Sequence, residues 1–120
     1  MKRELTKAEE QIMQAIWHVE KGFAKDILEV IPDPKPAYNT VLTVIRVLVQ
    51  KGFVAFQTFG KSNEYYPTIS KEDYSRRQMQ TMKKKYFNNS SKKMLSFFLK
   101  ENKLDLENVD EILKMIDDDQ

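Results

Sequence analysis

Residues 38–54, YNTVLTVIRVLVQKGFV, have two chemically different faces when drawn as an α-helix. An α-helix advances about 100° per residue, so side chains three and four positions apart share a face. The apolar face collects Val41, Val44, Ile45 and Leu48. The opposite face is polar, contains no acidic residue, and collects Asn39, Thr40, Thr43, Arg46 and Gln50. We therefore expect a helix that buries one face, exposes the other and ends at Gly52.

A first helix is expected upstream, in residues 5–19, LTKAEEQIMQAIWHV. Thr6 followed by Glu9 forms a capping box, in which hydroxyl and carboxylate accept hydrogen bonds from backbone N–H groups at the helix start. The apolar stripe of this helix consists of Ile12, Met13, Ile16 and Trp17. Gly22 is expected to end the helix.

A short second helix is expected in residues 24–31, AKDILEVI, with Ile27, Leu28 and Ile31 facing inward. Residues 32–37, PDPKPA, contain three prolines in five positions. Proline removes a backbone donor and biases the preceding residue to extended shapes, so this segment cannot continue a helix. It therefore connects the second helix to the helix of residues 38–50.

Residues 53–68 predict a β-hairpin, with strand FVAFQTF, turn GKSN and strand EYYPT. Helix, helix, proline-rich connection, helix and hairpin is the order of a winged helix-turn-helix. Such a third helix fits the major groove, where short polar side chains and Arg reach base edges, and the hairpin tip can contact phosphate. A winged helix that binds another protein and has no specific DNA target is the alternative.

Three segments resemble the penicillinase repressor family of bacterial transcription factors: LTKAEEQIMQAIW (5–17), AYNTVLTVIRVLVQKGFV (37–54) and GKSNEYYPTISKEDY (60–74). The resemblance extends over essentially the whole chain. It implies a mainly α protein, with a winged-helix DNA-binding domain in residues 1–70 and a helical dimerisation region in residues 71–120. It also implies a dimeric repressor on an inverted-repeat operator, a role in antibiotic resistance, and a membrane sensor with a metalloprotease domain whose signal leads to cleavage.

Carried over residue by residue, the resemblance implies six DNA-binding positions: Tyr38, Asn39, Thr40, Thr43, Arg46 and Lys61. Tyr38, at the helix start, would lie near a phosphate, and Lys61 would be a contact of the wing. Arg46 stands one position earlier than the arginine of many relatives. Val47 either touches a thymine methyl or packs on the flank of the helix, and Leu42 is a similar boundary position.

Residues 71–120 combine two oppositely charged blocks with two apolar stripes. Residues 71–93 contain eight Lys or Arg and two acidic residues, for a net charge of +6, whereas residues 101–120 contain two Lys and eight acidic residues, for −6. A basic stretch can approach phosphate and an acidic end avoids it. The first stripe, in residues 90–101, consists of Met94, Leu95, Phe98 and Leu99. The second, in residues 104–117, consists of Leu106, Val109, Ile112, Leu113 and Ile116.

Both stripes follow a complete domain, and apolar stripes of this kind must be buried against some other surface. They either pack back on their own domain or pack against a second copy, and we predict a dimer. In relatives of this type, the sensor-linked cut falls just before a phenylalanine, commonly after an asparagine. The resemblance thus implies a cut between Ser96 and Phe97, with Ser in place of Asn. In the alternative, Phe97 and Phe98 serve only as core aromatics.

Composition argues against other classes. The 120 residues are 41% hydrophobic and 11% aromatic, which suits one domain, or a small domain with an assembly element. There is no cysteine, and the single histidine, His18, is expected to be solvated, so we expect no metal or cofactor. Without a nucleophile motif or a phosphate-binding loop, no enzyme is expected. Without a long apolar run or a signal peptide, we expect a cytoplasmic protein.

Overall fold

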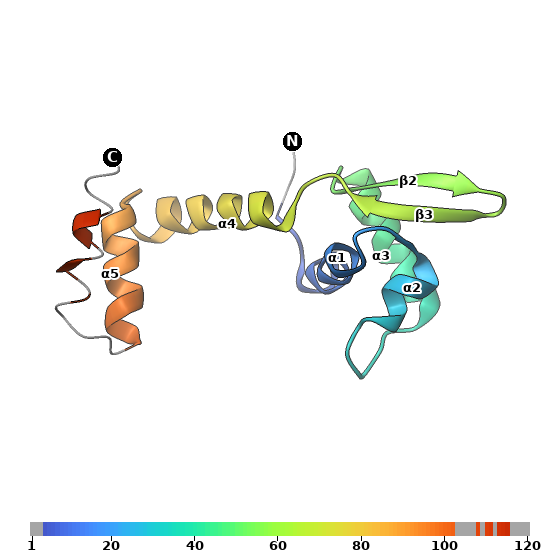
Figure 1. The fold of residues 1–120 in the computed structure, drawn as a ribbon, viewed down its shortest axis with the longest axis horizontal. Helices are drawn as coiled ribbons and strands as arrows, with labels where there is room; N and C mark the ends of the chain where they lie inside the picture. The colour runs from blue at the N-terminus through green and yellow to red at the C-terminus, as the bar shows by residue number, and fades with distance from the viewer. Residues whose placement is uncertain (1–3, 103–107, 109, 112, 116–120) are drawn as a thin grey trace. The chain divides into compact units, whose positions relative to one another are not determined.

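The structure is a computed structural model that describes residues 4–102, 108, 110, 111 and 113–115. The chain divides into two compact units, Met1–Lys71 (unit 1) and Glu72–Gln120 (unit 2). The elements of unit 1 are α1 (Lys7–Val19), β1 (Gly22–Phe23), α2 (Ala24–Glu29), α3 (Tyr38–Gln50), β2 (Val54–Phe59) and β3 (Ser62–Pro67) (Figure 1). Unit 2 contains α4 (Lys71–Tyr86), which begins at the last residue of unit 1, and α5 (Ser91–Glu101).

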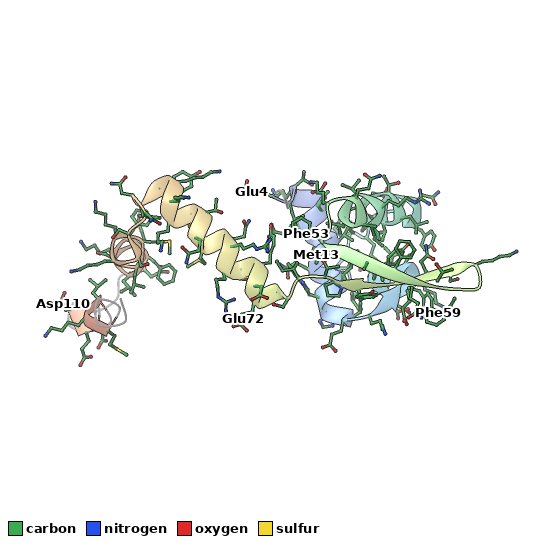
Figure 2. All side chains as sticks on the ribbon, turned by 90° about the horizontal axis from the view of Figure 1, so that it is seen from above. Glu4, Met13, Phe53, Phe59, Glu72 and Asp110 are labelled. Atoms are coloured by element: carbon green, nitrogen blue, oxygen red, sulfur yellow. The ribbon has the colours of Figure 1, made fainter. Side chains whose placement is uncertain are left out.

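The core of unit 1 is formed by the three helices and the residues that lead into β2. Its apolar side chains, each at most 2% exposed, include Ile12, Met13, Ile16, Ile27, Ile31, Val41, Ile45, Leu48 and Phe53. Figure 2 labels Met13 and Phe53 inside this unit. Burying a side chain of this size contributes about 1.5–3 kcal/mol relative to its exposure. The predicted apolar face of α3 is confirmed, with Val44 half-buried at its edge.

The start of α1 is as predicted and its end is not. Thr6 Oγ1 accepts a hydrogen bond from the Glu9 N–H (3.2 Å), and Glu9 Oε1 accepts one from the Thr6 N–H (3.0 Å). The helix ends at Val19 because Glu20 adopts a φ of 66°, a positive value that usually favours glycine. The prediction that Gly22 ends this helix is therefore wrong. Gly22 begins β1, and a Cβ there would lie 3.2 Å from Asp26 Cβ.

The sheet is antiparallel, with strand order β1-β3-β2. Phe59 pairs with Ser62, so the hairpin closes through a two-residue turn, Gly60 and Lys61. Gly60 has a φ of 61°, and glycine at the first turn position is the pattern of a type II′ turn. The predicted four-residue turn was too long, since Ser62 and Asn63 belong to β3. Strand β1 was not predicted, because two residues show no alternation.

Unit 2 buries little apolar surface within one chain. Among its described residues, Tyr74 and Leu99 are the buried hydrophobic side chains. Six large hydrophobic side chains are exposed: Met79, Met82, Tyr86, Phe97, Phe98 and Met115. Of the second predicted stripe, Leu106, Val109, Ile112 and Ile116 lie outside the described residues, and Leu113 is half-buried. The structure thus leaves apolar side chains of α4 and α5 facing solvent.

An ion pair joins the start of α1 to the end of α3. Lys51 Nζ lies 2.6 Å from Glu9 Oε1, and the side chains of Lys51 and Glu9 are 21% and 11% exposed. Burial by itself raises the pKa of Glu9. The hydrogen bonds from Lys51 and from the Thr6 backbone, together with the positive charge of Lys51, outweigh burial and lower that pKa below 4.5.

We expect the Glu9 carboxylate to make stability pH-dependent in acid. Because its pKa is lower in the folded state, the unfolded state binds more protons, so stability rises with pH in this range. The contribution is present above about pH 4.5 and is lost as the pH falls through the folded pKa. Glu9→Gln should cost about 1–3 kcal/mol near neutral pH and flatten this dependence.

Urea unfolding between about pH 3 and pH 7 measures both effects. The exposed neighbour Glu10 provides the matched control, Glu10→Gln, which should change little. Equal slopes of stability against pH for the wild-type protein and Glu9→Gln would contradict the assignment.

Candidate nucleic-acid interface

The polar face of α3 is open to solvent along its length. Asn39, Thr40, Thr43, Arg46 and Gln50 are all exposed. Thr43 Oγ1 donates to the Asn39 carbonyl oxygen (2.9 Å), so its hydroxyl proton is used within the helix while its oxygen can still accept. This face therefore offers short amide and hydroxyl groups and one guanidinium.

The N-terminus of α3 carries no side-chain cap. Ala37 is the N-cap residue, and the first turn has no acidic residue. The first backbone N–H groups of a helix lack partners within it, and they carry the positive end of the helix dipole. An anion is therefore favoured at this end. The adjacent Tyr38 side chain is 47% exposed.

A groove of about 560 Å³ lies between α3, the start of α2 and the hairpin. Its α3 side consists of Tyr38, Leu42 and Arg46, which are spaced four residues apart. The remaining lining residues are Phe23, Ala24, Lys25, Phe59, Lys61, Ser62, Asn63 and Tyr65. Three cationic side chains, Lys25 of α2, Arg46 of α3 and Lys61 of the hairpin turn, thus line one groove that has no acidic lining residue. In the described part of the chain, none of these three cations forms an ion pair.

One contact within the hairpin and one between β2 and β1 hold the hairpin side of the groove. Thr58 Oγ1 donates to Asn63 Oδ1 (2.8 Å), across the β2–β3 pair. The Phe59 ring, labelled in Figure 2, meets the Phe23 ring edge-on, with centroids 6.3 Å apart, and is 49% exposed. Lys61, in the turn, is exposed.

The six sequence-predicted DNA-binding residues divide between two adjoining surfaces. Tyr38, Arg46 and Lys61 line the groove. Asn39, Thr40 and Thr43 do not line it and lie on the exposed face of α3. The two boundary residues, Leu42 and Val47, are both half-buried. Leu42 lines the groove, whereas Val47 does not.

Sequence reasoning missed Lys25 as a candidate site residue. Lys25 is exposed in the first turn of α2 and lines the groove. The available signal was its place at the start of the second helix of a helix-turn-helix. Phe59 was also not assigned to the site, and Ser62 and Asn63 were expected near phosphate only as part of the hairpin tip, because their approach to α3 depends on the hairpin register.

Other predicted positions lie elsewhere. His18 is exposed near the end of α1. Ser96 is half-buried and Phe97 is exposed, both within α5. In the part of the chain that the structure describes, no group of three His, Cys, Asp or Glu side chains could hold a metal ion. Among the described helices, none has the length and apolar content needed to cross a membrane.

Three packed helices and a hairpin that borders a groove beside the third helix define a winged helix-turn-helix protein. The family model for the penicillinase repressor matches residues 5–118, so the chain belongs to the penicillinase repressor family. Its fold is similar to that in the solution structure of the DNA-binding domain of the repressor BlaI. The two are 23% identical with a TM-score of 0.52, and the match covers 62% of this chain and 94% of that chain. No curated protein matches the chain.

Proposed function

We propose that the protein is a transcriptional repressor, without enzymatic activity, that binds an inverted-repeat operator as a dimer in the cytoplasm. The observation that carries this proposal is the groove, where Lys25, Arg46 and Lys61 meet beside the exposed, acid-free face of α3. Membership of the penicillinase repressor family supports it. The mechanism is occupancy, in which the bound dimer covers a promoter and excludes polymerase.

In this proposal the two adjoining surfaces perform different tasks. The exposed face of α3 enters the major groove, where Asn39, Thr40 and Thr43 contact base edges. The sugar–phosphate backbone follows the groove, where Lys25 and Lys61 neutralise phosphates. Tyr38 and the uncapped start of α3 bind a further phosphate. Arg46 belongs to both surfaces, and we assign its guanidinium to a guanine edge, the commonest specific contact.

Base reading and phosphate binding are expected to respond differently to substitution. Arg46→Ala should weaken binding to the operator more than to scrambled DNA, by roughly 1–3 kcal/mol of discrimination, because a base contact is lost. Lys61→Ala and Lys25→Ala should weaken binding to all duplexes alike and lower the salt slope by about one phosphate contact each. Titrations of operator and scrambled duplexes at several salt concentrations measure both. Equal losses on both duplexes for Arg46→Ala would remove its base-reading role.

The competing function is a winged-helix module that binds another protein and has no specific DNA target. Selection of bound duplexes from a random-sequence pool separates the two. A palindromic consensus is the expected result. No enrichment, together with weak binding to duplex DNA that does not depend on salt, would favour the interaction module.

We assign DNA binding to residues 1–70 and dimerisation to residues 71–120. The six exposed hydrophobic side chains of unit 2 support this division, because one chain leaves them uncovered. Leu106, Val109, Ile112, Leu113 and Ile116 would contribute to the same interface. A dimer converts two weak half-site contacts into one two-site contact, which raises affinity through effective concentration.

We further propose that repression ends when a protease cuts between Ser96 and Phe97, in response to a membrane sensor with a metalloprotease domain. Phe97 is 55% exposed, and the bond lies inside α5. The cut would separate unit 1 from residues 97–120. Because a helix must open locally before a protease can bind its backbone, cutting should be slow unless α5 frays.

A further inference from the structure

A second groove, of about 420 Å³, lies within unit 2. We call it the lysine groove; its lining residues are Lys92, Lys93, Ser96, Phe97, Lys100 and Leu113. Lys93, Phe97 and Lys100 are spaced four and three residues apart and therefore share one face of α5. The three lysines are its charged lining residues, and no acidic residue lines it.

The lysine groove is apolar between its charges. Phe97 is 55% exposed, although its ring also contacts the Phe87 ring with centroids 5.6 Å apart. Leu113 is half-buried. An exposed phenylalanine bordered by ammonium groups fits a partner segment that is both apolar and acidic.

The C-terminal residues of the chain itself have this chemistry. Residues 101–120 have a net charge of −6 and contain the apolar residues of the second predicted stripe. Within one chain, Leu113 forms a wall of the lysine groove, whereas Asp110 (labelled in Figure 2) and Glu111 are exposed and do not line it. Their carboxylates are therefore available to another molecule.

We propose that the lysine groove of each copy binds the carboxylates of Asp110 and Glu111 (the acidic segment) of a second copy. This inference rests on the proposed dimer and specifies what holds it together. The interface is reciprocal, because in a two-fold dimer each copy supplies one lysine groove and one acidic segment. Charge pairing adds register and partner choice to the apolar contact.

A charge-reversal pair tests the inference in the full chain. Lys93→Glu/Lys100→Glu reverses the groove, and Asp110→Lys/Glu111→Lys reverses the acidic segment. Each variant alone should form a homodimer with a Kd on the order of tenfold higher, because like charges then face each other. Mixed in equal amounts, they should form a heterodimer at close to wild-type affinity. The wild-type homodimer should itself weaken on the order of tenfold between about 0.1 M and 1 M salt.

Sedimentation equilibrium without DNA measures the Kd, and native mass spectrometry identifies the heterodimer. Arg77→Glu/Lys84→Glu is the matched control for the groove, since both side chains are exposed in α4 and lie outside it. Glu10→Lys/Glu29→Lys is the control for the acidic segment, with both side chains exposed in unit 1. Both controls should dimerise like the wild-type protein. If a reversal variant fails to fold by circular dichroism, Lys93→Gln/Lys100→Gln replaces it and should lose the salt dependence.

The outcomes separate this inference from the proposed function. A wild-type protein that remains monomeric would overturn the dimer and the inference with it. A dimer whose Kd changes neither with salt nor with either charge reversal would support the proposed dimer and overturn the charge pairing. If both reversal variants dimerise more weakly and their mixture does not recover wild-type affinity, the lysines pair with carboxylates of their own chain. Unchanged dimerisation with weaker binding to every duplex would assign the lysine groove to the DNA backbone. Either of the last two results also overturns the inference.

Discussion

A chain that ends after Tyr74 is expected to fold, to remain monomeric and to lose operator affinity by a factor of roughly 10²–10⁴. The ten core side chains that are at most 2% exposed all lie between Ile12 and Val54, so the fragment keeps them. It also keeps the hydrogen bond from Trp17 Nε1 to the Ile69 carbonyl oxygen (2.9 Å), which ties the end of unit 1 to α1. It loses α4 beyond Tyr74, all of α5 and the proposed dimer interface, and with them the effective-concentration gain of two-site binding.

Sedimentation of the fragment, circular dichroism and titration of one operator duplex measure the three expected results. Fusion of the fragment to an unrelated dimeric coiled coil is the control, and it should recover most of the lost affinity, provided the linker spans both half-sites. A dimeric fragment would move the interface into residues 1–74. A monomeric fragment that binds operator as tightly as the full chain would show that dimerisation does not supply the affinity.

Induction of cells that carry the matching sensor is expected to cut the repressor within residues 94–98 and to release the operator. A cut at Ser96–Phe97 breaks α5 and removes Leu99, which is 3% exposed, from the DNA-binding fragment. Each N-terminal fragment then binds one half-site alone, with a loss of roughly 10²–10⁴ in affinity. Fragment masses from induced cells locate the bond.

Two neighbouring phenylalanines provide a matched comparison for this cut. Phe97 and Phe98 are 55% and 58% exposed in the same helix, so their substitution by alanine removes similar exposed surface. Phe97→Ala should slow cutting and delay induction, because the proposed bond precedes this residue, whereas Phe98→Ala should change the rate less. Intact protein throughout full derepression would exclude cleavage as the signal and point to a small ligand or a competing partner.

Periodicity predicted most of unit 1, because its helices bury one face against a single core. The apolar stripes of residues 12–17 and 41–48 repeat at helical spacing, and in each of them the structure buries three side chains. The end of α1 could not be predicted in this way. Glycine is the usual residue at a positive φ, yet here Glu20 adopts it two residues before Gly22. The length of the hairpin turn likewise depended on the pairing of Phe59 with Ser62, which composition does not determine.

Candidate site residues were predictable where one helix carries them together. Asn39, Thr40, Thr43 and Arg46 share a face of α3, so their common exposure follows from spacing. The groove does not follow from spacing, because it is assembled from segments far apart in the sequence. Lys25 becomes a candidate site residue only because the fold brings it, Arg46 and Lys61 to the lining of one groove. The structure therefore adds Lys25 as a candidate phosphate-binding residue, which the periodicity of the sequence could not predict.

If the proposed function holds, the hairpin turn, Gly60 and Lys61, affects DNA binding with little effect on folding. Lys61 and Ser62 are exposed, and a Cβ added to Gly60 would meet nothing within 4 Å, so the turn contributes little to the core of unit 1. At Gly60 itself, the positive φ favours glycine over other residues. Lys61 can consequently be exchanged for a neutral or acidic residue at little cost to the core. Over evolutionary time, selection can tune repressor occupancy at this one site while foldability stays constant, and the same freedom makes the wing tip a practical place to engineer affinity.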